Sequence, residues 1–353
     1  MNLKSMWNNL WNWEKWDYRI KYIPLYPAWL WYCLRAGSFW FFSASNPTLT
    51  FGGFEGEGKK EMYDQLQPST YPKSIYILSS MSFAEAERLI TADNLAYPFA
   101  VKPNVGMMGF LFRKIDDANM LRHYHERMPV DYIAQELVEY PIEVSVFYWR
   151  LPNEQHGTIT GFVKKEMLEI QGDGKTPLAQ LMLQLVGRPG FNLQEWRAKH
   201  AKRLHEIIPD GKVVRLSLVA NLSRGGKLIS LAHYKDEKLL KVFDDISHYT
   251  KHFYYGRYDI KCASIEDLKE GKNFSILEFN GSGAEPHHVY GNGNSLLQAH
   301  KIFLQHWNVL YKISKSNHEK GLPYWDFIKG LKFLISAKKH FKMLKRLDSE
   351  LDI

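Results

Sequence analysis

Two short segments of the sequence carry polar side chains two positions apart within otherwise apolar runs. The segment YYGRYDIKC contains Arg257 and Asp259, and the segment FSILEFNGSG contains Glu278 and Asn280. Because successive side chains of a β-strand point to opposite faces, each polar pair shares one face of its strand. The pattern therefore predicts two strands with one polar and one apolar face. A solvated edge strand that runs into a glycine turn explains either segment equally well when it is taken alone.

Three of these four side chains, Asp259, Glu278 and Asn280, offer oxygen atoms as metal ligands. Magnesium is a hard cation that binds through a few carboxylates together with substrate phosphates. Arg257 beside such an ion would stabilise charge on a transferring phosphoryl group or on a tetrahedral oxyanion. The two segments together would therefore suit a Mg²⁺ site.

A lysine and a glycine-rich loop farther upstream are typical of phosphate binding. In FAVKPNVGMMGFLF, Lys102 ends a β-rich run and a loop with Gly106 and Gly109 follows. Backbone N–H groups of such a loop can face an anion while lysine supplies a point charge. An ordinary hairpin with an exposed lysine is the alternative. Glu143, in IAQELVEYPIEVSVFY, either accepts hydrogen bonds from ribose hydroxyls or faces solvent.

A second glycine turn, QGDGKTP, imitates the end of a P-loop through Gly174, Lys175 and Thr176. The P-loop motif requires a glycine five residues before Gly174. Glu169 stands at that position. The sequence therefore excludes a P-loop at this turn.

The net charge of +8 is concentrated near one end of the sequence. Residues 329–346 hold seven Lys and Arg and no Asp or Glu, and removing those seven charges from +8 leaves +1 for all other residues. A nearly neutral body gives poor support to nucleic-acid binding. Apolar residues recur at helical spacing between these lysines, which predicts a basic amphipathic helix. Such a helix either packs on its own domain or lies on an anionic membrane surface.

Cysteine usage and the N-terminal residues bear on the compartment. Cys33 and Cys262 lie far apart and give neither a disulfide framework nor a zinc site, which suits a reducing cytoplasm. No secretory signal is recognised at the start of the sequence. Residues 7–42 contain most of the eleven tryptophans, but prolines and a charge interrupt the apolar run, leaving it too short to span a bilayer. Peripheral membrane contact, ordinary packing and a homodimer contact are left open for this region.

Strand and helix signals mix along the chain without regular alternation. Ser82 followed by Glu85 forms a capping box at the start of one expected helix. Strands are expected at PFAVKP, FLFRKI, YIAQELV and IEVSVFYW, and helices at SFAEAERLI, DDANMLRHYHERM, LAQLMLQLV, 236–251 and 294–314. The mixture predicts an α+β protein rather than a single doubly wound sheet.

Taken together, these segments resemble the ATP-grasp superfamily over roughly residues 55–310, nearest to D-alanine–D-alanine ligases and the ATP-grasp part of cyanophycin synthetases. VKPNVGMMG is similar to the Lys-Pro glycine loop of that family, and AQELVEYPIEVSV to its hinge strand and ribose-binding glutamate. GRYDI and LEFNGSG resemble its Arg-x-Asp and Glu-x-Asn elements. KKEMLEIQGDGKTPLAQLM resembles a stretch of cyanophycin-type enzymes in which a basic residue precedes a Gly-Asp-Gly turn.

The resemblance implies an ATP-grasp fold, in which two α+β subdomains grip ATP, with a short aromatic-rich N-terminal region and a C-terminal basic helix added. Four parts are expected on this basis. They are an N-terminal region and lead-in (1–95), a small lid subdomain (96–156), a large subdomain with the metal site (157–320) and the basic helix (321–353).

The resemblance also implies roles for individual residues. Lys102 would bind the α- and β-phosphates of ATP, Lys59 or its neighbour Lys60 would add a second phosphate contact, and Lys165 or Lys164 would reach the γ-phosphate. Gln135, Glu136 and Leu137 would form the adenine hinge, largely through backbone atoms, beside the glycine loop with Gly106 and Gly109. Glu143 would hold the ribose, and Arg257 would be the catalytic cation. Asp259, Glu278 and Asn280 would bind one or two Mg²⁺ ions, with Mn²⁺ as an alternative.

The implied activity is an ATP- and Mg²⁺-dependent ligase that joins a small carboxylate to an amine through an acylphosphate. The alternatives are an ATP-grasp kinase and a non-catalytic, membrane-peripheral binding protein. The family has a Rossmann-like substrate domain where this chain has a short Trp-rich region, so a D-alanine-like acceptor is not implied. Candidate substrate contacts, each equally well explained as an ordinary side chain, are Arg215, Arg224, His233, His287 and His288.

Overall fold

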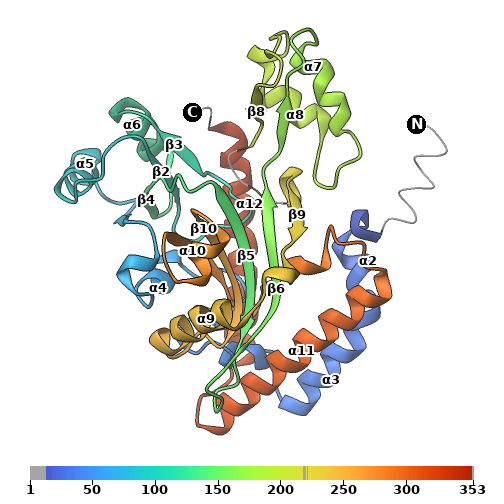
Figure 1. The fold of residues 1–353 in the computed structure, drawn as a ribbon. Coiled ribbons are helices and arrows are strands. Elements are labelled where there is room, and N and C mark those ends of the chain that lie inside the picture. Colours follow the sequence, from blue (N-terminus) through green and yellow to red (C-terminus); the bar gives the residue numbers. More distant parts are fainter. Residues whose placement is uncertain (1–12, 218–219, 221, 352–353) are drawn as a thin grey trace.

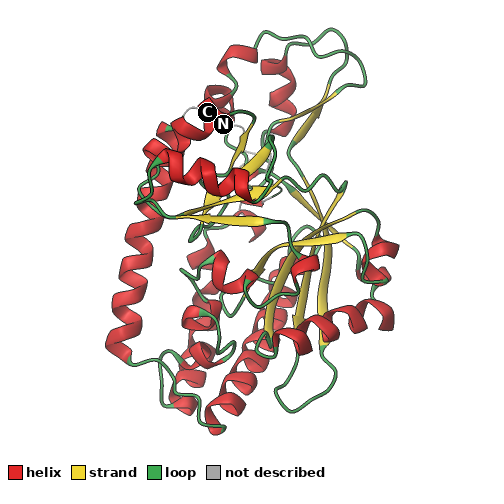
Figure 2. Ribbon diagram, turned by 90° about the vertical axis from the view of Figure 1, so that its left-hand side faces the viewer, coloured by secondary structure: helices red, strands yellow, loops and turns green. Residues whose placement is uncertain are grey.

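The structure is a computed structural model that describes residues 13–217, 220 and 222–351. It contains a four-stranded, a five-stranded and a two-stranded sheet, each made of antiparallel pairs, with helices packed around them (Figures 1 and 2). The prediction of an α+β protein is therefore confirmed.

The four-stranded sheet has the order β1-β4-β2-β3. Its strands are β1 (Ser74–Ile77), β2 (Phe99–Pro103), β3 (Arg113–Ile115) and β4 (Tyr132–Glu136), and its helices are α5 (Phe83–Ala92) and α6 (Ala118–Arg127). Ser82 caps α5 through the predicted capping box with Glu85. The strand expected at 110–115 is shorter than predicted. Leu111 has a φ of 57°, a left-handed conformation that cannot continue a strand, so β3 begins only at Arg113.

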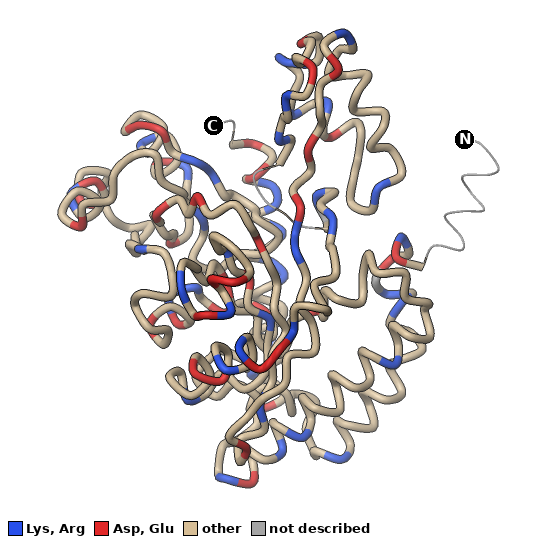
Figure 3. Tube along the Cα trace, viewed as in Figure 1, with Lys and Arg blue, Asp and Glu red and all other residues tan. Residues whose placement is uncertain are grey.

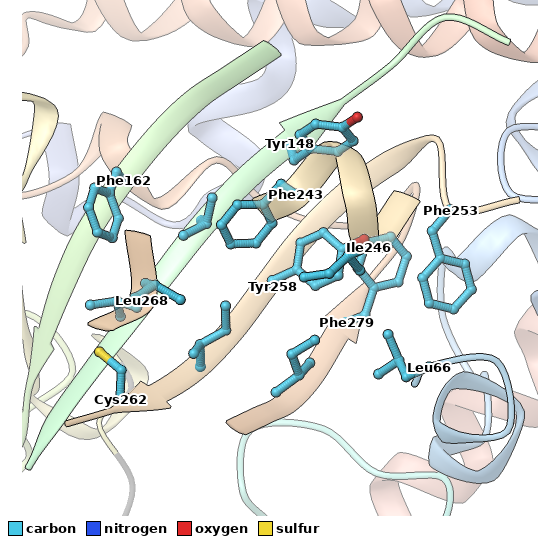
Figure 4. Packing of buried hydrophobic residues seen from close by; sticks show 14 of the residues in the cluster. Leu66, Tyr148, Phe162, Phe243, Ile246, Phe253, Tyr258, Cys262, Leu268 and Phe279 are labelled. Carbon is cyan, nitrogen blue, oxygen red and sulfur yellow. The ribbon is translucent and has the colours of Figure 1, made fainter. Parts of the chain in front are cut away.

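The five-stranded sheet has the order β11-β10-β5-β6-β9. Its strands are β5 (Ile142–Trp149), β6 (Thr158–Glu166), β9 (Lys227–Ser230), β10 (Tyr255–Cys262) and β11 (Phe274–Asn280). One face packs against α9 (Glu237–Thr250) and α10 (Ile265–Lys269) in a core that includes Tyr148, Tyr258 and Phe279 (Figure 4). The other face packs against α11 (Leu296–Glu319) through Phe147 and Tyr255, and the polar side chains farther along that face belong to the site.

A small two-stranded unit interrupts the five-stranded sheet between β6 and β9. It consists of β7 (Glu169–Gln171), β8 (Val213–Arg215), α7 (Leu178–Leu181) and α8 (Leu193–Lys199), and it has its own apolar core around Trp196 (Figure 1). The helix expected at 178–186 ends as α-helix at Leu181 and continues as a 3-10 turn over Met182–Leu185.

The aromatic N-terminal region packs on α11 through α2 (Tyr18–Tyr22) and α3 (Tyr26–Ala36). Trp29 makes an edge contact with Trp307, their ring centroids 5.0 Å apart, and Tyr32 stacks on Tyr311 at 5.1 Å. Ordinary packing thus accounts for one face of these helices. Trp7 and Trp11, which belong to the same aromatic segment of the sequence, lie outside the described residues.

The predicted basic helix is α12 (Phe327–Glu350), and it packs on the rest of the chain along its length. Its first half contacts the N-terminal aromatic core through Phe333 and Leu334, whereas Leu344 lies in the core of the four-stranded sheet. Figure 2 shows α12 along the left-hand edge of the molecule. Among the described residues, every helix is too short or too polar to cross a bilayer.

Sheet membership divides the chain differently from the expected ranges 1–95 and 96–156. β1 precedes residue 95 but pairs with β4, and β5 precedes residue 156 but is a central strand of the five-stranded sheet. The break between the two larger sheets therefore lies between Glu136 and Ile142. The assignment of these parts as domains stays a prediction.

Candidate active site

A cavity of about 990 Å³ lies between the four-stranded and five-stranded sheets. Its walls come from β2, the glycine loop and the end of β4 on one side, and from β5, β6, β10 and β11 on the other. This volume is at the upper end of the range of small-molecule sites, which are roughly 300–1,000 Å³. Basic and acidic residues adjoin at the end of β6 (Figure 3), and three of them, Lys164, Lys165 and Glu166, line the cavity.

The pairing of β10 with β11 places the four predicted polar residues side by side. Asp259 lies directly opposite Glu278, and Arg257 lies directly opposite Asn280. The guanidinium of Arg257 contacts both carboxylate oxygens of Asp259, at 3.2 and 3.3 Å, and the amide nitrogen of Asn280 is 3.5 Å from Asp259 Oδ2. The alternating pattern in the sequence thus corresponds to one polar surface built by two strands.

Lys165 joins this surface from β6, two strands away. Its Nζ lies 3.2 Å from Asp259 Oδ2 and 3.3 Å from Glu143 Oε1, and its side chain is buried. Burial opposes ionisation of Asp259, but Arg257 and Lys165 outweigh it and hold the pKa of that carboxyl well below its usual range. The pKa of Glu143 is raised, chiefly by burial and against the effect of Lys165. Lys164 pairs instead with Glu166 at 3.3 Å and is partly exposed.

Lys59 enters from the start of α4 (Lys59–Tyr63) and meets Glu278. Its Nζ is 3.1 Å from Glu278 Oε1 and 3.5 Å from the carbonyl oxygen of Gly106. Burial favours the neutral acid at Glu278, but Lys59 and Lys102 lower the pKa of this carboxyl below its usual value. The rival candidate Lys60 points elsewhere and pairs with Asp64 at 2.6 Å.

Lys102 projects from β2 into the cavity. Its Nζ donates to the hydroxyl of Tyr63 at 3.2 Å and to the carbonyl of Leu277 at 3.4 Å. Burial, reinforced by the nearby positive charge of Lys59, lowers the pKa of Lys102 to about 7. The side chain thus changes its charge near neutral pH, where an anionic ligand would favour the charged form.

The predicted hinge comprises the last two residues of β4, Gln135 and Glu136, and the following residue Leu137, and all three line the cavity. The side chain of Gln135 donates to Ser74 Oγ at 2.7 Å and to the Tyr63 hydroxyl at 3.0 Å, so it is occupied inside the protein. The amide nitrogen of Gln135 is therefore already used inside the protein.

The glycine loop between β2 and β3 is anchored from two directions. Arg224 donates to the carbonyl oxygens of Met108 at 3.0 Å and Gly109 at 3.2 Å, and His340 of α12 bonds the carbonyl oxygen of Val105 at 2.8 Å. Gly109 has a φ of 68°, which favours glycine. Arg224, a candidate substrate contact, is thus engaged in holding the loop.

The other candidate substrate residues are spread over three places. Arg215 lines the cavity and pairs with Glu169 at 3.0 Å, whereas His233 packs against the ring of Tyr234 outside it. His287 lies near Asp259, and the Nδ1 atoms of His287 and His288 are both buried. Burial lowers the pKa of both imidazoles, that of His288 to about 4, so both are neutral at ordinary pH.

Two further residues escaped the sequence analysis, Lys261 in the cavity lining and Tyr63 buried next to Lys102. Tyr63 bridges Lys102, Gln135 and Leu277, and nothing in its local sequence indicates that role. Lys261 donates to the carbonyl oxygen of Val138 at 2.8 Å. Its position two residues after Asp259 on the same strand face is a signal that could have found it.

The donor set fits a hard divalent cation, since Asp259 and Glu278 are both held ionised and Asn280 adds a carboxamide oxygen beside them. Within residues 13–217, 220 and 222–351, no group of three or more His, Cys, Asp and Glu side chains is arranged to hold a metal ion. The three predicted ligands contribute two carboxylates, and each of these contacts a lysine.

Comparison with known proteins gives structural likenesses only. No family model matches the chain, and no curated protein matches its sequence. The chain is similar in structure to D-alanine–D-alanine ligase from Bacillus anthracis (TM-score 0.42, 14% identity, covering 75% of this chain and 69% of that one). It is also similar to the VanG D-Ala:D-Ser ligase from Enterococcus faecalis (TM-score 0.41, 14% identity, 74% and 62%). A third likeness is to a bifunctional glutathione synthetase from Pasteurella multocida (TM-score 0.39, 15% identity, 70% of this chain). The match spans 35% of that synthetase, about a third of its length.

Proposed function

We propose that this protein is an ATP-grasp enzyme that uses ATP and Mg²⁺ to join a small-molecule carboxylate to an amine. The observation that carries the proposal is the polar surface of β5, β6, β10 and β11, where Lys165, Glu143, Asp259 and Glu278 face one cavity between two antiparallel sheets. Phosphoryl transfer relies mainly on positioning and neutralisation of charge, and this surface offers both.

The residues would divide the work by position. Lys102 and Lys59 lie beside the glycine loop and would bind the ATP phosphates, while Lys165 would reach the γ-phosphate. Asp259, Glu278 and Asn280 would hold Mg²⁺, which when bound neutralises phosphate charge. Glu143 would accept from the ribose hydroxyls.

The first chemical step would transfer the γ-phosphoryl group. A carboxylate oxygen of the substrate attacks γ-phosphorus, the bond to the β-phosphate oxygen breaks, and ADP leaves. In the second step the amine nitrogen attacks the acyl carbon, inorganic phosphate leaves and the nitrogen loses a proton. Arg257, fixed by Asp259 and by the carbonyl oxygen of Glu285 at 2.9 Å, would stabilise the oxyanion of the second step.

The test is an ADP-release screen with Mg-ATP over amino acids, short peptides and hydroxy acids, with hydroxylamine present in parallel samples. A ligase should release ADP with an active carboxylate, and hydroxylamine should capture the acylphosphate as a hydroxamate. ADP release that gives a stable phosphorylated hydroxyl compound and no hydroxamate would instead identify a kinase.

Two double variants test whether the activity depends on the proposed metal site. Glu278→Gln combined with Asn280→Ala should lower ADP release at least about a hundredfold, because two metal ligands are lost. The matched control, Glu270→Gln combined with Asn153→Ala, changes the same residue types at exposed positions and should leave the rate unchanged. Equal rates in the two pairs would contradict the metal site.

A further inference from the structure

A set of exposed large apolar side chains lies outside the cavity and takes no part in the proposed reaction. We call it the α3–α12 surface, because it covers the outward faces of α2 and α3 and the first turns of α12. Leu34 is 77% exposed and Trp31 is 58% exposed. Its large apolar side chains are Ile20, Ile23, Tyr26, Leu30, Trp31, Leu34, Phe39, Phe327, Ile328, Leu331 and Ile335.

The exposed face of α3 is a second apolar face on a helix whose first face is already packed. Trp29, Tyr32 and Cys33 belong to the core shared with α11. Ile23, Tyr26, Leu30 and Leu34 recur three or four positions apart and all point outward. A helix that is apolar on both faces has one face to bury against something other than its own domain.

The start of α12 extends this surface. Phe327 meets the ring of Phe39 with centroids 5.5 Å apart and stacks on Trp40 at 5.9 Å. The indole nitrogen of Trp40 donates to the carbonyl oxygen of Phe327 at 3.0 Å, which fixes the two segments together.

Farther along α12, lysines follow the exposed apolar residues on the same side of the helix. Residues spaced by seven share a helix face, and Ile328 and Ile335 are followed at that spacing by Lys342. Residues 329–346 contain no acidic side chain. In the described part of the chain, none of the salt bridges involves the exposed side chains of Lys339, Lys342 or Lys345. Their charge is therefore available to an anionic partner.

We propose that the α3–α12 surface binds an anionic lipid bilayer. Exposed Leu and Ile would enter the acyl boundary, Trp31 and Tyr26 suit the interface, and the α12 lysines would contact anionic headgroups. A second copy of the chain is a poorer partner, because a symmetric interface would bring two uniformly basic 329–346 segments near each other. This binding is independent of the proposed ligase activity.

The test is co-sedimentation of the full chain with vesicles of phosphatidylcholine alone and of phosphatidylcholine mixed with phosphatidylserine. The chain should bind the mixed vesicles more tightly, and added salt should weaken that preference. Lys339→Gln combined with Lys342→Gln should weaken binding to the mixed vesicles by about tenfold. Leu30→Gln combined with Leu34→Gln should abolish binding to both kinds of vesicle.

The matched control variants change residues outside the α3–α12 surface. Lys202→Gln with Lys212→Gln removes two exposed charges, and Leu183→Gln with Tyr249→Gln removes two exposed apolar side chains. Both controls should bind like the unaltered chain.

Two results would overturn the proposal. One is equal loss of binding in the control pairs and the surface variants. The other is no binding to mixed vesicles together with a dimer, seen by sedimentation velocity, that Leu30→Gln with Leu34→Gln converts to monomer.

Discussion

Lys102 is a buried lysine whose charge depends on pH in the range where enzymes are assayed. Burial and Lys59 lower its pKa to about 7, so the free protein loses this positive charge as pH rises through 7. ATP phosphates would favour the charged form, so binding above pH 7 requires uptake of a proton. We expect ATP affinity to fall as pH rises above about 7, up to tenfold per pH unit. Calorimetric titration in two buffers of different ionisation enthalpy measures both the affinity and the proton uptake.

The control for this prediction is Lys102→Arg, since arginine stays charged at all accessible pH values. This variant should show a flatter dependence on pH and less proton uptake. Glu57 is the other group near Lys59 and Glu278 whose pKa lies at about 7, where it is raised by burial. Lys102→Arg should leave a small pH dependence of ATP affinity that comes from Glu57. Glu57→Gln should remove that part and no more. A profile unchanged by Lys102→Arg would contradict the role of Lys102.

Some residues of the site could be predicted from the sequence, and others could not. Arg257, Asp259, Glu278 and Asn280 could be placed on shared strand faces because strand periodicity is a local property. The partner of Glu278 could not be found in this way. Lys59 is more than two hundred residues away along the chain and meets it only through the packing of α4 against β11.

At the scale of elements, α12 links the glycine loop to the segment between β8 and β9. Asp348 accepts hydrogen bonds from the backbone N–H of Leu111 at 2.8 Å, from Arg113 at 2.9 Å and from Arg224 at 3.3 Å. Arg224 in turn donates hydrogen bonds to the carbonyl oxygens of Met108 and Gly109. One carboxylate near the end of a helix therefore fixes the loop that is proposed to cover phosphates.

Asp348→Asn should loosen that loop. The amide keeps the size of the side chain but removes the charge that two guanidiniums share, and charge-assisted hydrogen bonds contribute about twice as much as neutral ones. We expect faster hydrogen exchange over residues 104–112 and an ATP affinity weaker by about tenfold. Mass spectrometry of exchange and calorimetry measure the two effects. Glu350→Gln, which alters an exposed pair with Arg346, should change neither. Unchanged exchange in Asp348→Asn would show that other contacts hold the loop.

The sequence predicted α12 as a basic amphipathic helix but left its surroundings open. Apolar spacing along a helix reveals that a face is buried without telling what buries it. Phe333 and Leu334 pack near the N-terminal region and Leu344 packs under the four-stranded sheet, and each contact joins segments far apart in the sequence. The helix was therefore predictable, whereas its two partners were not.

At the scale of the whole molecule, hydrogen bonds join the aromatic N-terminal region to the five-stranded sheet. The side chain of Asn46 is fully buried and makes four hydrogen bonds. Its amide nitrogen donates to the carbonyl oxygens of Gly52 at 3.0 Å and Tyr255 at 2.9 Å. Its oxygen accepts from the backbone N–H groups of Tyr254 at 2.9 Å and Tyr255 at 3.0 Å. Asn46 thus joins the N-terminal region directly to β10, the strand that carries Arg257 and Asp259.

Asn46→Ala should lower the free energy of unfolding by about 3 kcal/mol, because it leaves several buried backbone groups without partners. Urea unfolding should be followed by far-UV circular dichroism and by tryptophan fluorescence, since most tryptophans lie in the N-terminal region. In the unaltered chain the two signals should change together. In Asn46→Ala the fluorescence transition should come at lower urea, as the N-terminal region detaches first. The exposed control Asn153→Ala should stay within about 0.5 kcal/mol. A fluorescence transition that precedes circular dichroism already in the unaltered chain would show that the N-terminal region unfolds independently of the sheet.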